Sequence, residues 1–280
     1  MPRRPIALLV LLLGVLCAVA AAILLGDWRS DRYRLRSEAL RETRRYLVSL
    51  PEGYDTGACP CPLLVLLDGG DQKQHSAERT LYARSREVLA ALRRAGFPPI
   101  VLVGVENRNR VKDMTPVERP DLYVGGGGSL AFMRFIETEL VPRVVERWRI
   151  GDTRILYGES YAGLFVLDAL ARGERAFTDY VAVSPAVGTW PDGLREAFRR
   201  RPPGAPDPRS LFIVYGEKDG PLIVDHTPGF ARDIAPALPA GLRFSREVLP
   251  GEGHSPERSL ERALRFIFAQ ASQRVAARRR

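Results

Sequence analysis

Four short polar segments of this sequence carry the residue types that covalent acyl chemistry needs. In one of them, Gly-Glu-Ser-Tyr-Ala-Gly, Ser160 stands between an apolar run and a helical pattern. A serine hydroxyl is a poor nucleophile unless a base accepts its proton and a carboxylate orients that base. Further along the chain, Asp219 ends Gly-Glu-Lys-Asp and His254 ends Gly-Glu-Gly-His. The order serine, aspartate, histidine therefore predicts a catalytic triad of Ser160, Asp219 and His254.

Acyl transfer through a serine also needs donors for an oxyanion, and backbone N–H groups are expected to supply them. Tyr161 begins the helix that follows the serine, where the positive end of the helix dipole lies. The second donor is predicted to be Gly70, with Gly69 as the alternative, because Asp-Gly-Gly follows the apolar run PLLVLL. A tight turn at the serine needs small neighbours, and Gly158 and Ala162 satisfy that need.

The acid and the base each have competitors in the sequence. Glu217 and Asp225 lie close to Asp219 and are alternatives for the acid. The chain has 3 histidines. His75 begins a helical segment and His226 follows the aspartate closely, so both are interpreted as surface, pocket or loop residues. The histidine that follows the last apolar strand pattern is the expected base.

The elements that must position these residues alternate between strand and helix through most of the chain. Continuous apolar runs such as PLLVLL, PPIVLVGV, TRILY, DYVAV and LFIVY are typical of strands buried on both faces. Helical spacing appears in ERTLYARSREVLAALRRAG, YAGLFVLDALARG and PERSLERALRFIFAQA. The alternation predicts an α/β fold with a mostly parallel sheet, flanked by helices and edged by an antiparallel pair at residues 33–50. All four polar segments follow predicted strands, where sites form in such sheets.

One predicted helix, SLAFMRFIETELVPRVVERW, has an internal proline. Ser129 is expected to cap this helix, and Pro142 is expected to bend or break it. Its apolar stripe consists of Met133, Ile136, Leu140, Val144 and Trp148.

The N-terminal segment, residues 1–26, is excluded from the fold, which leaves residues 27–280 as a single domain. Arg3 and Arg4 precede an uncharged, mostly apolar run from Pro5 to Gly26, which is long enough to span a bilayer. The run is either a membrane anchor or a secretory signal. Because it continues beyond the small-residue cleavage pattern at residues 18–20, it favours an inner-membrane anchor with the domain outside the cytoplasm, or secretion if it is cleaved.

Composition argues against nucleic-acid binding and against a zinc site, and it leaves the role of two arginines open. The formal net charge is +9, and it is interpreted as a solvated basic surface because no nucleic-acid-binding motif accompanies it. Cys59 and Cys61 are too few for a zinc site and form either a local disulfide or two thiols. Arg108 and Arg110 lie in an irregular stretch after a strand, where they either meet an anionic substrate or are solvated. No cofactor and no metal are expected.

Seven stretches between Ser37 and Phe268 together resemble the putative esterase family of the α/β-hydrolases. That family includes the enterochelin and salmochelin esterases and is related to S-formylglutathione hydrolases. Among the stretches are PLLVLLDGG, VLVGVENRNRVKDMTP, YGESYAGLFVLDAL and LPGEGHSPERSLERALRFIF. The resemblance implies an α/β-hydrolase fold with Ser160 as nucleophile and His254 as base. It also implies that a Ser–His pair, acting without Asp219, is an option in the siderophore-type members.

The residues and the resemblance together predict a serine esterase that cleaves carboxylic esters through an acyl-enzyme on Ser160. The expected substrate is a siderophore lactone or another small acyl ester, and the expected membrane contact is through the N-terminal segment. One alternative is an acyltransferase that uses the same Ser–His site. The other is a catalytically inactive, membrane-tethered binding module.

Overall fold

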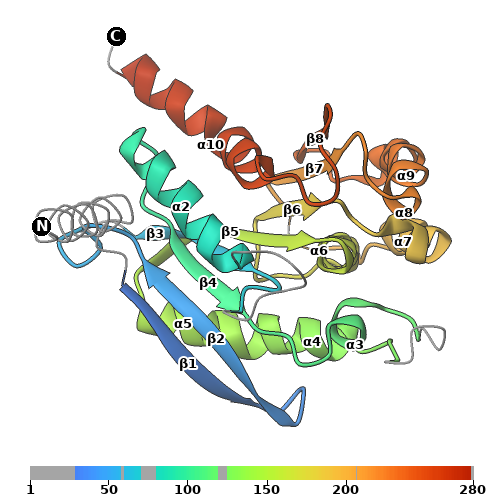
Figure 1. The fold of residues 1–280 in the computed structure, drawn as a ribbon, viewed down its shortest axis with the longest axis horizontal. Helices are drawn as coiled ribbons and strands as arrows, with labels where there is room; N and C mark the ends of the chain where they lie inside the picture. The colour runs from blue at the N-terminus through green and yellow to red at the C-terminus, as the bar shows by residue number, and fades with distance from the viewer. Residues whose placement is uncertain (1–28, 58–59, 71–79, 119–124, 206, 279–280) are drawn as a thin grey trace, which may run out of the picture.

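Eight strands form one sheet in the computed structural model, which describes residues 29–57, 60–70, 80–118, 125–205 and 207–278 (Figure 1). The strands are β1 (Arg29–Ser37), β2 (Glu42–Leu50), β3 (Cys61–Leu66), β4 (Val101–Val105), β5 (Ile150–Glu159), β6 (Asp179–Val183), β7 (Ser210–Gly216) and β8 (Arg243–Leu249). Their order in the sheet is β1-β2-β4-β3-β5-β6-β7-β8. β2 pairs antiparallel with β1 and β4, and the other neighbours are parallel. The predicted mostly parallel sheet with an antiparallel edge is confirmed.

The central strands bury side chains on both faces of the sheet. In β3, Leu63 and Val65 belong to one core cluster, whereas Leu64 and Leu66 belong to the other. All four side chains are fully buried. Successive side chains in a strand point to opposite faces, so a strand covered on both sides must be apolar at every position. This is the physical reason why these strands appear in the sequence as continuous apolar runs.

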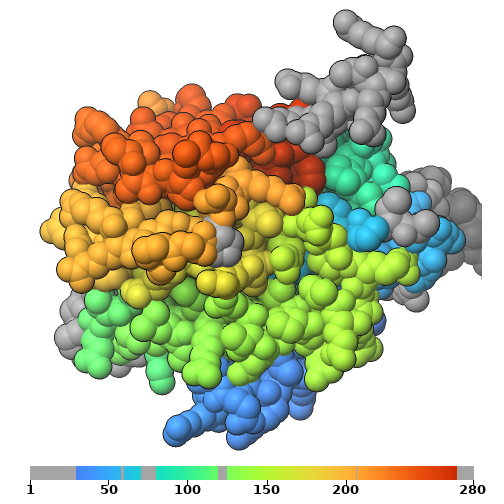
Figure 2. Space-filling view, turned by 180° about the vertical axis from the view of Figure 1, so that it is seen from behind, coloured from blue at the N-terminus to red at the C-terminus, as the bar shows by residue number. Residues whose placement is uncertain are grey.

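Helices cover the two faces unequally (Figure 1). α2 (Leu81–Arg94) and α10 (Ser259–Arg278) pack on one face. The other face carries α4 (Ser129–Phe135), α5 (Val141–Arg147), α6 (Tyr161–Arg172), α7 (Pro191–Arg199) and α9 (Thr227–Ile234). Seen from behind, the segments from α4 to α9 form a continuous surface, coloured green to orange, and the blue β1–β2 hairpin projects below it (Figure 2).

The segment predicted as one long helix consists of α4, a π-helical turn at Ile136–Leu140 and α5. Pro142 is near the start of α5, and because it has no N–H to donate, the regular helical ladder cannot continue through it. The helix does not break at Pro142: it continues from Ser129 to Arg147, and the irregularity is the π-helical turn just before the proline. The predicted burial of the apolar stripe is confirmed. The prediction that Ser129 caps the helix is wrong. Gly128 is the N-cap, and Ser129 is already the first helical residue with its side chain buried.

Several elements differ from the sequence-based expectation. α3 (Arg110–Met114) and α7 lie in stretches that the sequence patterns predict as loops. α3 spans little more than one turn, too short to show an apolar period, whereas α7 begins at Pro191, a residue type that suggests a loop but also fits the first turn of a helix. The predicted membrane or signal segment lies outside the described residues, as do His75 and Cys59. Among the residues that the structure describes, no helix has the length and apolar character needed to cross a membrane. The same residues contain no cluster of three or more histidine, cysteine or acidic side chains suited to a metal ion.

Candidate active site

Ser160 occupies a sharp turn between the end of β5 and the start of α6. Its backbone has φ 61° and ψ −117°, a conformation that residues with a side chain rarely adopt. The Ser160 N–H donates to the Val183 carbonyl at 2.9 Å, and the Ser160 carbonyl accepts from the Ala186 N–H at 3.1 Å. The end of β6 and the segment after it therefore hold the strained turn in place. A serine on such a strand-to-helix turn is the geometry of a nucleophile elbow.

Close packing around the turn explains the small residues beside the serine. A side chain at Gly158 would collide with the backbone of Ala162. A Cβ at Gly163 would lie 2.9 Å from the Val183 carbonyl oxygen. The final small residue of the sequence motif is alanine, and the Ala162 side chain is fully buried. The turn therefore accepts alanine at that position but requires glycine at the two others.

His254 and Asp219 are in direct contact. The Nδ1 atom of His254 lies 2.7 Å from Oδ1 of Asp219, and the Gly220 N–H donates to the same oxygen at 2.8 Å. The Asp219 side chain is fully buried, whereas that of His254 is 49% exposed. Burial by itself raises the pKa of Asp219, but hydrogen bonds from His254, Ser184 and Gly220 together hold it below its usual value. Asp219 is therefore an ionised carboxylate at neutral pH.

The other candidates for the acid and base lie elsewhere. Glu217 accepts the Gly251 N–H through Oε2 at 2.8 Å, and Asp225 ends the short helix α8 (Pro221–Val224). His226 precedes α9 and packs beside Gly188, where an added Cβ would lie 2.6 Å from its ring. Of the three carboxylates considered from the sequence, Asp219 is the one that contacts His254.

Ser184, which the sequence patterns do not single out, connects the histidine loop with the serine turn. Its hydroxyl accepts the Ser255 N–H at 3.0 Å, and it helps to hold the pKa of Asp219 low. Val183, the residue before Ser184, in turn accepts the Ser160 N–H. These contacts hold the loop of His254 against the turn of Ser160. The sequence could have indicated Ser184 only by its position. It directly follows β6 and so lies at the same edge of the sheet as the other site residues.

The loop after β3 presents the two glycines considered as oxyanion donors. The Gly69 N–H already donates to the Val105 carbonyl at 3.0 Å. At Gly70, an added Cβ would lie 2.8 Å from the Glu106 side chain. Tyr161, the other proposed donor, is the first residue of α6. The commitment of the Gly69 N–H to Val105 favours Gly70 as the donor from this loop.

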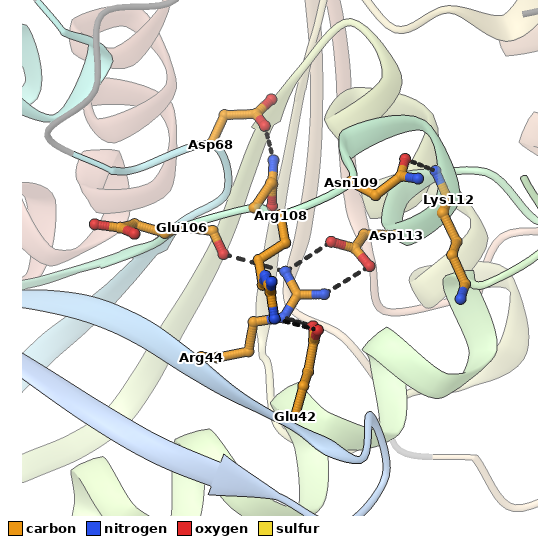
Figure 3. Close-up of polar contacts among 9 residues, drawn as sticks. Glu42, Arg44, Asp68, Glu106, Arg108, Asn109, Lys112 and Asp113 are labelled. Atoms are coloured by element: carbon orange, nitrogen blue, oxygen red, sulfur yellow. Dashed lines mark hydrogen bonds and ion pairs between the residues drawn. The ribbon is translucent and has the colours of Figure 1, made fainter. Parts of the chain in front are cut away.

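The two arginines considered as substrate ligands have different partners. Nε of Arg110 lies 2.8 Å from Oδ2 of Asp68, and its Nη2 donates to the Glu159 carbonyl at 2.9 Å. Its guanidinium lies 5.5 Å from the centre of the Tyr161 ring. Arg108 is 68% exposed and pairs with Glu42 at 3.0 Å (Figure 3). Arg110 thus contacts both segments of the candidate oxyanion site, whereas Arg108 reaches towards the β1–β2 hairpin.

Comparison with known proteins identifies a matching family model, related esterases and a similar solved structure. Residues 37–210 match the family model described as "Putative esterase". The siderophore triacetylfusarinine C esterase of Aspergillus fumigatus is 33% identical over 212 residues, which cover 70% of this chain and 68% of that protein. The apo-salmochelin esterase of Escherichia coli O6:H1 is 32% identical over 148 residues, or 48% of this chain and 44% of that protein. An IroE-like serine hydrolase from Shewanella oneidensis has a TM-score of 0.75 at 27% identity, covering 87% of this chain and 80% of that one.

Proposed function

This chain belongs to the putative esterase family and is a serine-type carboxylic ester hydrolase with an α/β-hydrolase-like fold, and from that premise we propose that it cleaves its substrate through an acyl-enzyme on Ser160. The observation that carries the proposal is the 2.7 Å contact between His254 and a buried, ionised Asp219. The Ser255 N–H, next to His254, donates to Ser184, which directly follows β6, and the last residue of β6 accepts the Ser160 N–H. A base oriented by a carboxylate beside a serine elbow is the arrangement that activates a serine hydroxyl.

In the acylation step, Ser160 Oγ bonds to the ester carbonyl carbon while its proton moves to Nε2 of His254. The carbonyl oxygen becomes an oxyanion, which accepts hydrogen bonds from the backbone N–H groups of Gly70 and Tyr161. The intermediate then collapses, the bond to the leaving oxygen breaks, and the proton on His254 passes to the departing alcohol. Asp219 stabilises the imidazolium that forms between these two proton transfers.

In the deacylation step, a water molecule takes the place of the alcohol. His254 accepts a proton from the water as its oxygen bonds to the acyl carbon, and the same two N–H groups stabilise the second oxyanion. Cleavage of the bond to Ser160 Oγ, with return of the proton to that oxygen, releases the carboxylic acid and regenerates the enzyme. The cycle consumes one water molecule and uses neither metal nor organic cofactor.

We propose a siderophore ester as the substrate class. Two relatives at 33% and 32% identity are named as esterases of siderophores, and they support this choice over an unrelated small acyl ester. Hydrolysis of catecholate and hydroxamate siderophore esters, followed by chromatography of the acid and alcohol products, tests the substrate class. Turnover of simple acyl esters with no cleavage of either siderophore type would contradict it.

The nucleophile is tested by the change Ser160→Ala in the full-length protein. We expect hydrolysis of a short p-nitrophenyl ester to fall by at least about 10,000-fold, because the covalent pathway is lost. A fluorophosphonate probe should label the unmodified protein and fail to label the variant. Ser245→Ala is the control, since Ser245 lies within β8 and outside the proposed site. Equal rates in the protein and its Ser160→Ala variant would remove Ser160 from the mechanism.

A further inference from the structure

The two proposed oxyanion donors lie on segments just beyond the paired part of β3 and β5. β3 and β5 are parallel neighbours, but the ladder between them ends at Leu66 and Tyr157. Gly70 and Tyr161 both lie beyond those residues, past the last strand pairing. A donor stabilises an oxyanion only when it stays within hydrogen-bond distance of the developing charge. Backbone bonds extend the link slightly, from the Leu67 N–H to the Tyr157 carbonyl, and tie Gly69 to β4 and Ser160 to β6. A direct contact between the two segments nearer to Gly70 and Tyr161 would fix the separation of the donors themselves.

Arg110 makes contacts to both of these segments. Its Nε–Oδ2 contact of 2.8 Å with Asp68 holds the loop before Gly70, and the Asp68 side chain is only 2% exposed. Its Nη2 donates to the carbonyl of Glu159, which directly precedes Ser160, and its guanidinium stacks over Tyr161. The planar, multiply donating guanidinium can make these contacts at once, which a lysine ammonium cannot reproduce in the same geometry.

The helix that carries Arg110 is itself held by a buried arginine. α3 is five residues long, which is too short to be stable alone. Arg44 of β2 binds the carboxylate of Asp113 on α3 through both terminal nitrogens, at 2.7 and 2.8 Å, and pairs with Glu42 at 2.6 Å. The side chain of Arg44 is buried, and Figure 3 shows its contacts with Asp113 and Glu42. The hairpin thus holds α3, and α3 directs Arg110 at the site.

We propose that Arg110 is a positioning residue that fixes the separation of the Gly70 and Tyr161 oxyanion donors, and that Arg44 holds it in place through Asp113. The inference rests on the proposed function, because it assigns a role within that oxyanion site. Loss of the bridge leaves the serine, histidine and aspartate unchanged but lets the two donors move apart. The cost therefore falls on the transition state rather than on the binding of substrate.

The test compares Arg110→Gln and Arg110→Lys with Arg172→Gln in the full-length protein. Arg172 is a matched control, because its Nε also lies 2.8 Å from a buried aspartate, Asp168, and its side chain is 35% exposed against 31% for Arg110. It lies at the far end of α6 from Ser160. For Arg110→Gln we expect kcat to fall about 100-fold, as for a small misplacement of catalytic groups, with KM changed by less than about threefold. Arg110→Lys should recover part of the loss.

A second measurement is independent of catalysis. Amide hydrogen exchange in peptides covering residues 66–70 and 157–161 should be faster in Arg110→Gln than in Arg172→Gln, because the bridge between the two segments is lost. Unchanged exchange in both peptides would overturn the positioning role, and so would a raised KM with unchanged kcat, which would make Arg110 a substrate ligand. If Ser160→Ala instead retains activity, the proposed nucleophile fails, and the exchange experiment still decides the role of Arg110.

Discussion

At the scale of single residues, the burial of Asp219 explains how His254 can act as a base. The carboxylate is fully buried and its pKa is held low, so it remains charged beside Nδ1 of the imidazole. With the Nδ1 proton donated to Asp219, the other ring nitrogen, Nε2, is left as the acceptor for the serine proton. The half-exposed imidazole is therefore oriented from its buried side and open to a substrate on the other.

The change Asp219→Asn tests this dependence. We expect kcat for a short p-nitrophenyl ester to fall by about 10,000-fold, because an amide can hold the imidazole in the wrong tautomer and cannot stabilise the imidazolium. Asp225→Asn is the matched control, since Asp225 ends α8 and His254 contacts a different carboxylate. A loss smaller than about tenfold in Asp219→Asn would instead favour a Ser–His pair that works without an acid.

At the scale of elements, the connection from α6 to β6 contains a buried carboxyl group. Glu174 is 5% exposed and accepts hydrogen bonds from the Ala176 N–H and the Tyr180 hydroxyl. Burial, the largest cause, raises the pKa of Glu174 from 4.5 to about 7 in spite of these bonds, and nearby Glu137 adds to the rise. The folded chain therefore keeps this proton at pH values where the unfolded chain has already released it. The contribution of Glu174 to stability must therefore fall as the pH rises from about 4.5 to about 7.

The change Glu174→Gln should remove that pH dependence. Above about pH 7 the variant should be more stable than the unmodified protein, by on the order of 3 kcal/mol, because it no longer buries an ionising group. Urea unfolding at about pH 5 and about pH 8 measures the difference. Glu146→Gln is the control on an exposed helix face, where Glu146 pairs with Arg143. An identical loss of stability between the two pH values in Glu174→Gln would contradict the assignment.

At the scale of the whole molecule, the sheet order brings distant sequence segments to one edge. β3, β5, β6, β7 and β8 are consecutive and parallel in the sheet, so the residues that follow them meet at their carboxyl ends. The four polar segments and Ser184 all follow strands of this set. Parallel connection through helices on the two faces is what gathers them, since each crossover returns the chain to the same edge.

The N-terminal segment gives a prediction about the location of this domain. Because residues 5–26 are uncharged and mostly apolar, we expect them to insert into or cross a membrane and carry the domain out of the cytoplasm. Expressed in a bacterial host, a C-terminal alkaline phosphatase fusion should be active and a cytoplasmic β-galactosidase fusion inactive. Deletion of residues 1–26 should reverse both results. Activity of only the cytoplasmic reporter in the intact chain would contradict the prediction.

Local patterns in the sequence were sufficient for the sheet strands, the turn at Ser160 and the choice of His254 as the candidate base. Strand burial and tight turns depend on side-chain period and size within a few neighbouring residues, so their evidence is contained in those residues. An irregularity near Pro142 was readable for the same reason, because the missing N–H is a property of one residue, but its form as a π-helical turn was not. The helix start was misplaced at Ser129, since Gly128 lies one position earlier and both can begin a helix.

Only the tertiary structure decided which carboxylate contacts His254 and what each arginine does. Glu217, Asp219 and Asp225 share one short stretch, and the path of the chain after β7 selects among them. Arg108 and Arg110 are two positions apart, yet one reaches the hairpin and the other the serine turn. The reason is that α3 begins at Arg110 and is held through Asp113 by a strand far away in sequence. Contacts between distant segments leave no periodic signal in either one, so they exist only once the chain has folded.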